Sequence, residues 1–203
     1  MSDYESKAIM EEETSDAELV RRCQKSDHKA FDLLVHRYRG KIYSMIYNLV
    51  NNDADAWDLA QEVFIKAWRA LPKFEERATF YTWIYRIAHN VTYDAMRKKK
   101  IQGATEFDDS MRNAIAPGSI TTPSGVLEPD KAAQNQELGV KISRAMEQLS
   151  PEHRTAICLK EINGLRYHEI AEVMGCSTGT VMSRLFYARK KLQEILKSDY
   201  DNI

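Results

Sequence analysis

Cysteine is scarce in this 203-residue chain, and no cysteine pattern points to a disulfide framework. Only Cys23, Cys158 and Cys176 are present, odd in number and far apart, whereas small disulfide-dependent domains carry even sets of cysteines. The five histidines also lack zinc spacing, because the neighbouring His153 and Cys158 have no second pair to complete a site. We therefore expect reduced thiols in a cytoplasmic protein, with no metal and no cofactor.

Long apolar runs and an excess of charge of one sign are also missing. No run approaches the roughly 20 residues of a membrane span, and the N-terminus lacks the basic-then-apolar order of a signal peptide, so no membrane insertion is expected. Lys and Arg number 29 against 30 Asp and Glu, for a net charge of -1. The basic residues gather at 97–100 and 184–191, and the acidic ones at 3–18. This distribution suits a protein that meets DNA only within a larger complex.

Apolar residues recur at helical spacing along most of the chain, and no strand pattern competes with them. Helices are expected over residues 15–25, from Asp27 to the Asn51-Asn52 break, over 53–71 and over 79–98. Glycine, proline and threonine interrupt the pattern afterwards, and helical periodicity resumes near Lys131. The predicted fold is all-α, with two small helical domains joined by a flexible linker. Its expected segments are an acidic mobile tail (1–14), an N-terminal domain (15–101), a linker (102–130) and a C-terminal domain (131–203).

The C-terminal domain contains a helix-turn-helix pattern. A short helix from Tyr167 ends at Gly175, and Ser177, a favourable N-cap residue, opens a longer basic helix. The expected buried side of that helix carries Val181, Leu185, Ala188, Leu192 and Ile195. An ordinary helical hairpin with a solvated face is the alternative. The turn, the cap and the basic flanks agree with DNA recognition by the second helix, so we favour that interpretation.

The helix from Asp53 has two unlike sides. Its apolar side is expected to pack into the domain, and its polar side presents Asp58, Gln61, Glu62, Ile65 and Arg69. A solvated face is the default explanation for such residues. An isoleucine among charges also fits a polar-rimmed helix that docks on another protein.

Residues 80–86 are richer in aromatic side chains than one core stripe requires. Phe80 and Ile84 point inward by spacing, so Tyr81, Trp83 and Tyr85 cannot all share that side. Exposed aromatic rings beside basic residues can stack on the bases of single-stranded nucleic acid. The alternative, that they cover the edge of the domain's core, has about equal weight.

Three motifs together resemble bacterial sigma factors of the extracytoplasmic-function (ECF) group. They are Asp55-Ala-Trp-Asp-Leu-Ala-Gln-Glu-Val-Phe-Ile-Lys-Ala-Trp68, then Phe80-Tyr-Thr-Trp-Ile-Tyr-Arg-Ile-Ala-His-Asn90, then Gly179-Thr-Val-Met-Ser-Arg-Leu-Phe-Tyr-Ala-Arg189. The match covers roughly residues 15–100 and 135–195, in the family's order and with a linker where the family has one. Three ordered motifs are far more specific than one helix-turn-helix.

The resemblance implies a promoter-specificity subunit of RNA polymerase and assigns residues to three surfaces. The docking face on core RNA polymerase would be Asp58, Gln61, Glu62 and Ile65. Opening of the −10 element of promoter DNA would involve Phe74, Arg77, Phe80, Tyr81, Trp83, Tyr85, Arg86, Arg97 and Lys98. Reading of the −35 element would involve Ser177, Thr178, Thr180, Met182, Ser183, Arg184, Phe186, Tyr187, Arg189 and Lys190.

The chain also departs from the family pattern. The family often has a glycine-containing loop after the position of Phe74, where this chain has Glu75-Glu-Arg-Ala-Thr79, and commonly has arginine where this chain has Met182 and Tyr187. These differences leave the promoter sequence open. Many family members are held inactive by an anti-sigma factor, often membrane-anchored, so such a partner is implied.

No catalytic residues are expected, because no nucleophile–base pair, phosphate loop or metal motif is present. Two other functions compete with the sigma-factor prediction. A stand-alone helix-turn-helix regulator would need a dimerisation or sensor domain, which residues 15–100 do not suggest. A helical adaptor would use the aromatic cluster only for packing.

Overall fold

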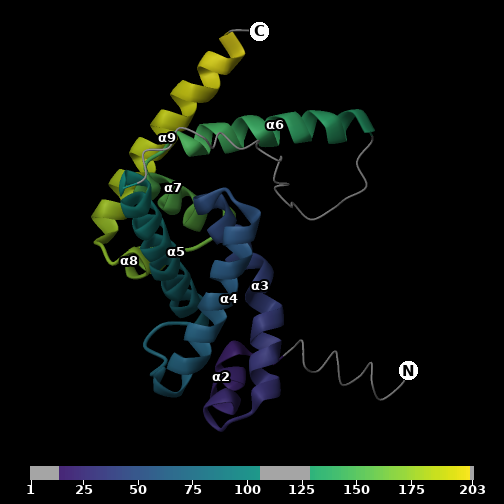
Figure 1. Cartoon of the computed structure of the whole chain (residues 1–203), viewed down its shortest axis with the longest axis vertical. Coiled ribbons are helices and arrows are strands. Elements are labelled where there is room, and N and C mark those ends of the chain that lie inside the picture. The colour runs from purple at the N-terminus through teal and green to yellow at the C-terminus, as the bar shows by residue number, and fades with distance from the viewer. Residues whose placement is uncertain (1–13, 106–128, 202–203) are drawn as a thin grey trace.

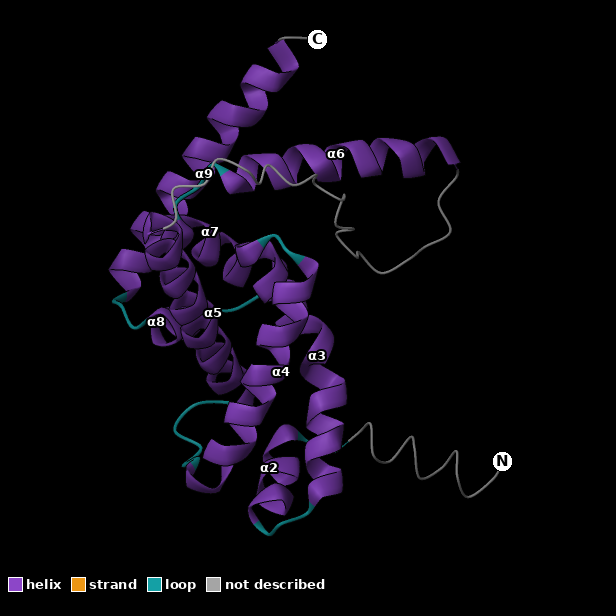
Figure 2. Cartoon of the chain, viewed as in Figure 1, coloured by secondary structure: helices purple, strands orange, loops and turns teal. Residues whose placement is uncertain are grey.

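The computed structural model describes residues 14–105 and 129–201, and within those ranges all regular structure is helical (Figure 2). The predicted all-α fold is therefore confirmed. The tail before Thr14 and residues 106–128 of the predicted linker lie outside the described residues, so the expectations for them stay predictions. Two boundaries differ from the sequence prediction, since the fourth expected helix continues to Thr105 and the next helix begins at Pro129.

The described part of the N-terminal half contains four α-helices and one 3-10 turn. In chain order these are α2 (Asp16–Gln24), α3 (His28–Val50), α4 (Asp53–Ala70), the 3-10 turn η1 (Leu71–Lys73) and α5 (Phe80–Thr105). The C-terminal half contains α6 (Pro129–Glu147), α7 (Pro151–Ile157), the π-helical turn η2 (Cys158–Ile162), α8 (Tyr167–Met174) and α9 (Thr178–Asp201).

Short polar side chains fix the starts of the helices, as the sequence predicts. The oxygens of Ser15, Asp27, Ser150 and Ser177 each accept a hydrogen bond from the backbone N–H three residues later, at 3.1–3.3 Å. Each cap satisfies an N–H that the first helical turn leaves without a partner. Between α8 and α9, Gly175 adopts a φ of 61°, the left-handed conformation that ends a helix most easily with glycine.

The apolar stripes of α2, α3, α4 and α5 meet in the core of the N-terminal half. Ile42, Met45 and Ile46 of α3 are fully buried, as are Val63 of α4 and Ile84 of α5. These residues recur at the spacing that places one side of a helix against its neighbours. The core therefore follows the pattern read from the sequence.

The two halves of the chain also pack against each other, which the sequence did not predict. Helix α8 packs against α5 (Figure 1), and Tyr85 of α5 is fully buried. Contact between α5 and α8 gives α5 two buried sides, one toward its own domain and one toward the C-terminal half.

Candidate polymerase and promoter interfaces

The predicted docking face on α4 is exposed as a continuous polar strip. Asp58, Gln61 and Glu62 are all exposed, and Ile65 has half of its surface accessible. Glu62 forms an ion pair with Lys66 one turn later, at 2.8 Å. The opposite side of the helix is buried in the core, so this strip is free to contact another molecule.

The outward side of α9 is unusually apolar for a solvent-facing helix. Val181, Leu185 and Ala188 are buried as predicted. Three large side chains on the opposite side, Met182, Phe186 and Tyr187, are each more than half exposed, and the Phe186 and Tyr187 rings contact edge to face. The −35 residues Ser177, Thr178, Ser183 and Lys190 are also exposed, and Thr180 is half-buried.

Two arginines of α9 are engaged within the chain. Arg189 forms an ion pair with Glu161 at 2.6 Å, and this hydrogen bond raises the pKa of the Arg189 guanidinium. Arg184 is half-buried and lies 3.6 Å from the sulfur of Cys176, in the turn before α9. A phosphate contact by Arg189 therefore has to replace Glu161, and Arg184 is directed toward the turn.

The predicted −10 residues begin in the loop between η1 and α5. Phe74 is half-buried and its ring packs on Trp83, with 4.8 Å between ring centroids. Arg77 is exposed and pairs with Glu75 at 2.6 Å. Glu76 has a φ of 52°, a left-handed conformation that residues other than glycine rarely adopt. The loop thus makes the kind of turn for which a glycine is well suited, although glutamate occupies it here.

Of the three aromatic residues for which exposure and core packing had about equal weight, Trp83 and Tyr85 are buried here. Trp83 is only 8% exposed because it packs between Phe74 and Phe80. Tyr85 is fully buried under the C-terminal half, and burial raises the pKa of its phenol. Tyr81 is half-buried. The alternative interpretation, that aromatic rings cover a core edge, holds for Trp83 and Tyr85 in this conformation.

Residues of the C-terminal half form hydrogen bonds with hydroxyl groups of α5. The hydroxyl of Tyr81 donates a hydrogen bond to the carbonyl of Asn163. The hydroxyl of Thr82 donates to Glu169 at 3.3 Å, and further along α5 the hydroxyls of Tyr93 and Thr155 lie 3.1 Å apart.

A second polar contact joins the halves at the end of α3. Arg154 of α7 donates to the carbonyl of Leu49 at 3.2 Å and to that of Glu147 at 2.7 Å. Asn51, the C-cap of α3, donates from its amide to the carboxylate of Glu147. Sequence reasoning missed these residues, because nothing local marks a pair separated by about a hundred positions.

Among the remaining −10 candidates, Arg86 lines a pocket together with Phe74, Arg77 and Trp83. Arg86, Arg97 and Lys98 are exposed along α5, and Arg97 pairs with Asp94 at 3.0 Å. Lys98 lines a groove shared with Asp58 of the docking face. Lys98 therefore lies closer to the candidate polymerase surface than its predicted role implied.

Comparison with known families accounts for both halves. The family model for Sigma-70 region 2 matches residues 34–101, and that for Sigma-70, region 4, matches residues 139–192. The ECF RNA polymerase sigma-E factor of Escherichia coli K12 is 39% identical over 185 residues, which cover 90% of this chain and 95% of the relative. The chain belongs to the ECF group of RNA polymerase sigma factors.

Other relatives agree with this membership. The RNA polymerase sigma-H factor of Pseudomonas aeruginosa is 37% identical over 182 residues, which cover 90% of this sigma factor and 94% of the relative. The structure of the sigma factor RpoE in complex with the anti-sigma factor NepR from Bartonella quintana matches with a TM-score of 0.64 and 29% identity. It covers 84% of this sigma factor and 99% of the solved chain.

The family regions contain all three candidate surfaces. The docking strip and the −10 residues lie within the region 2 match, and the −35 residues lie within the region 4 match. No helix among the described residues is long and apolar enough to cross a bilayer. In the same residues no three histidine, cysteine or acidic side chains come together in a way that would hold a metal ion.

Proposed function

We propose that this sigma factor docks on core RNA polymerase through Asp58, Gln61, Glu62 and Ile65 and directs the enzyme to specific promoters. The observation that carries the proposal is the presence of two separate outward surfaces in one chain of this family. These are the polar strip of α4, whose other side is buried, and the exposed side of α9, which begins after a helix-turn-helix turn. The chemistry of RNA synthesis belongs to the polymerase, so this chain acts in the cytoplasm as an initiation factor and not as an enzyme.

The geometry of a promoter adds a requirement for this function. The −10 and −35 elements are separated by about 25 base pairs, which is on the order of 85 Å of B-DNA. In this structure α8, which leads directly into α9, lies in hydrogen-bond contact with α5. One chain cannot read both elements while α5 and α8 touch. The halves must separate on the polymerase, and the 106–128 segment is the only covalent connection between them.

We also propose that an anti-sigma factor controls this sigma factor. The Bartonella quintana sigma factor that matches this fold was solved in complex with an anti-sigma factor. We extend that kind of partner to this chain, since a regulator that binds both halves would keep them from separating.

Transcription by purified core RNA polymerase tests the proposed function. Core polymerase with this chain should start RNA at defined genomic positions, mapped by sequencing of RNA 5′ ends, whereas either component alone should not. A stand-alone helix-turn-helix regulator would instead protect operator DNA in footprints without polymerase. Defined DNA footprints by the chain alone, with no new start sites, would favour the regulator.

A further inference from the structure

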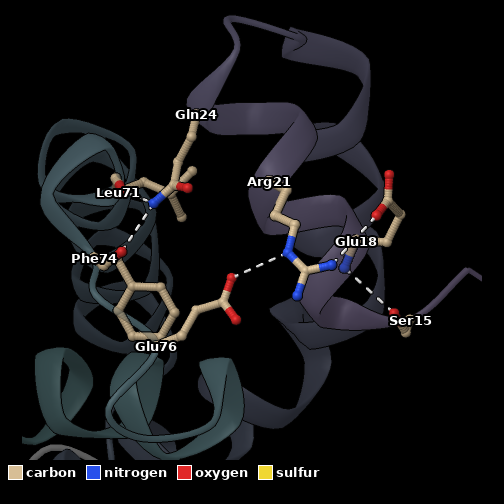
Figure 3. A network of polar contacts seen from close by, with 7 residues as sticks. All are labelled: Ser15, Glu18, Arg21, Gln24, Leu71, Phe74 and Glu76. Carbon is tan, nitrogen blue, oxygen red and sulfur yellow. Dashed lines mark hydrogen bonds and ion pairs between the residues drawn. The ribbon is translucent and has the colours of Figure 1, made fainter.

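Helix α2 is bound directly to the loop that carries Phe74 and Arg77. The side-chain amide of Gln24 donates to the carbonyl of Phe74 at 2.9 Å and to that of Leu71 at 3.3 Å (Figure 3). Phe74 ends η1, where a carbonyl has no partner within the helix, whereas the Leu71 carbonyl also accepts the backbone N–H of Phe74 at 3.0 Å. One amide group therefore fixes the point at which the chain leaves η1 and enters the loop.

A second contact from the same helix reaches the centre of the loop. Arg21 forms an ion pair with Glu76 at 3.6 Å and lies 3.9 Å from Glu18 on its own helix (Figure 3). Glu76 is the loop residue with left-handed backbone conformation, at a φ of 52°. Since glutamate rarely adopts this conformation by itself, the ion pair with Arg21 supports the turn where it is least favourable.

Helix α2 is itself anchored to α3, so it can act as a fixed support. Asp16 accepts a hydrogen bond from Arg37 of α3 at 2.5 Å and another from the hydroxyl of Tyr38. Leu19 and Val20 are completely buried in the core. The anchored side of α2 faces α3, and Arg21 and Gln24 extend from it toward the loop.

We propose that Gln24 and Arg21 are positioning residues that set the conformation of the 74–79 loop and thereby the bases that the chain prefers at the −10 element. The inference rests on the proposed function, in which this loop meets promoter DNA. Neither residue needs to touch DNA. Gln24 holds the backbone beside Phe74, and Arg21 holds Glu76 next to Arg77, so both contacts determine where the Phe74 ring and the Arg77 guanidinium stand.

Selection of promoters from a library with a randomised −10 element tests this role in the complete polymerase–sigma complex. Gln24→Leu removes both donors at an exposed position, and Arg21→Ala removes the ion pair. Each should change the preference at one or two adjacent −10 positions on the order of three- to tenfold, the range expected for one or two lost hydrogen bonds. Core polymerase affinity and the preferred −35 sequence should stay the same.

The neighbouring Lys25, which is exposed on the same turn, supplies the control, and Lys25→Ala should leave the −10 preference unaltered. The charge exchange Arg21→Glu with Glu76→Arg should restore the wild-type preference more fully than either single change. A uniform loss of activity on every −10 sequence, with the preference unchanged, would show that α2 only stabilises the fold and would overturn the inference. If the unmodified chain starts no transcription with core polymerase, the proposed function itself fails.

Discussion

The hydroxyl of Tyr81 in α5 donates a hydrogen bond to the backbone carbonyl of Asn163, 82 residues further along the chain. The next residue, Thr82, makes a similar contact with the carboxylate of Glu169. Oxygen acceptors of the C-terminal half thus occupy these two donors of α5, and we call this contact between the halves the closed arrangement. Under the proposed function this side of α5 meets the −10 strand, so the closed arrangement and the opened strand would compete for one surface.

A covalent link that holds the halves together should block promoter opening. Ala78 in the loop and Glu172 on α8 line the same cavity, so cysteines at both positions can be joined by a reducible bis-maleimide linker. Permanganate reactivity of −10 thymines should fall by roughly tenfold or more, because apparent affinity scales with the fraction of competent molecules. Core polymerase should still bind, since the strip on α4 lies elsewhere.

The linked protein provides its own control, because a thiol cleaves the linker and should restore opening. Cys176, the half-buried native cysteine, is first changed to serine, whereas Cys23 and Cys158 are buried. Full opening by the linked protein would show that the closed arrangement is compatible with promoter binding. Failure of the linker to join the two cysteines in the free chain would contradict the closed arrangement.

Introduction of a positive charge on the α4 strip should weaken polymerase binding without unfolding the protein. Gln61→Arg places a cation between Asp58 and Ile65 at an exposed position, where substitutions usually change the free energy of unfolding by no more than about 0.5 kcal/mol. Binding to labelled core polymerase and thermal unfolding are measured on the same preparation. Arg39, exposed on α3 and away from this strip, gives a control as Arg39→Gln. Unchanged affinity for Gln61→Arg would exclude this strip as the docking face.

Replacement of Met182 by arginine should add a preference for guanine at one position of the −35 element. Arginine pairs with the O6 and N7 atoms of guanine, a contact worth about 1–3 kcal/mol of discrimination, whereas methionine offers only apolar contact. Met182 is more than half exposed on the outward side of α9. Selection from a randomised −35 library is the measurement, with Arg189→Ala expected to weaken all sequences alike. An unaltered preference for Met182→Arg would mean that this side of α9 does not enter the groove.

Acidification should destabilise the protein through His89. Burial is the main cause that lowers the pKa of His89 below its ordinary value of 6.5, and Arg184 of α9 lowers it further, while the Asn90 side chain opposes the shift. The unfolded chain therefore binds more protons than the folded chain just below pH 6.5. The stability that neutral His89 allows is fully present above pH 6.5 and is lost as the pH falls toward the lowered folded-state pKa.

Urea unfolding at pH 7.0 and pH 5.5 measures the effect of His89. The ring of His89 stacks on Tyr93 at 4.3 Å between centroids, so His89→Phe keeps an aromatic neighbour without the titrating group. The variant should lose less stability than the wild type between the two pH values. An equal loss in both proteins would assign the pH dependence to other groups.

The sequence by itself determined the helices, their caps and the outward faces of α4 and α9. Ser177 caps α9, and Val181, Leu185 and Ala188 are buried, because cap chemistry and 3.6-residue periodicity act within a few positions of the chain. Asp58 and Gln61 are exposed for the same reason, as they stand opposite the apolar stripe of their own helix.

Only the tertiary structure decided what covers α5 and what holds the 74–79 loop. Helical periodicity shows that Tyr81 and Tyr85 cannot lie on the same side of the helix as Ile84. The local sequence pattern is the same for an aromatic side chain that is exposed for stacking on a base and for one that a second domain covers. The two hydrogen bonds of Gln24 span 47 and 50 residues. Such contacts depend on how whole helices pack, which the spacing of residues along one helix does not specify.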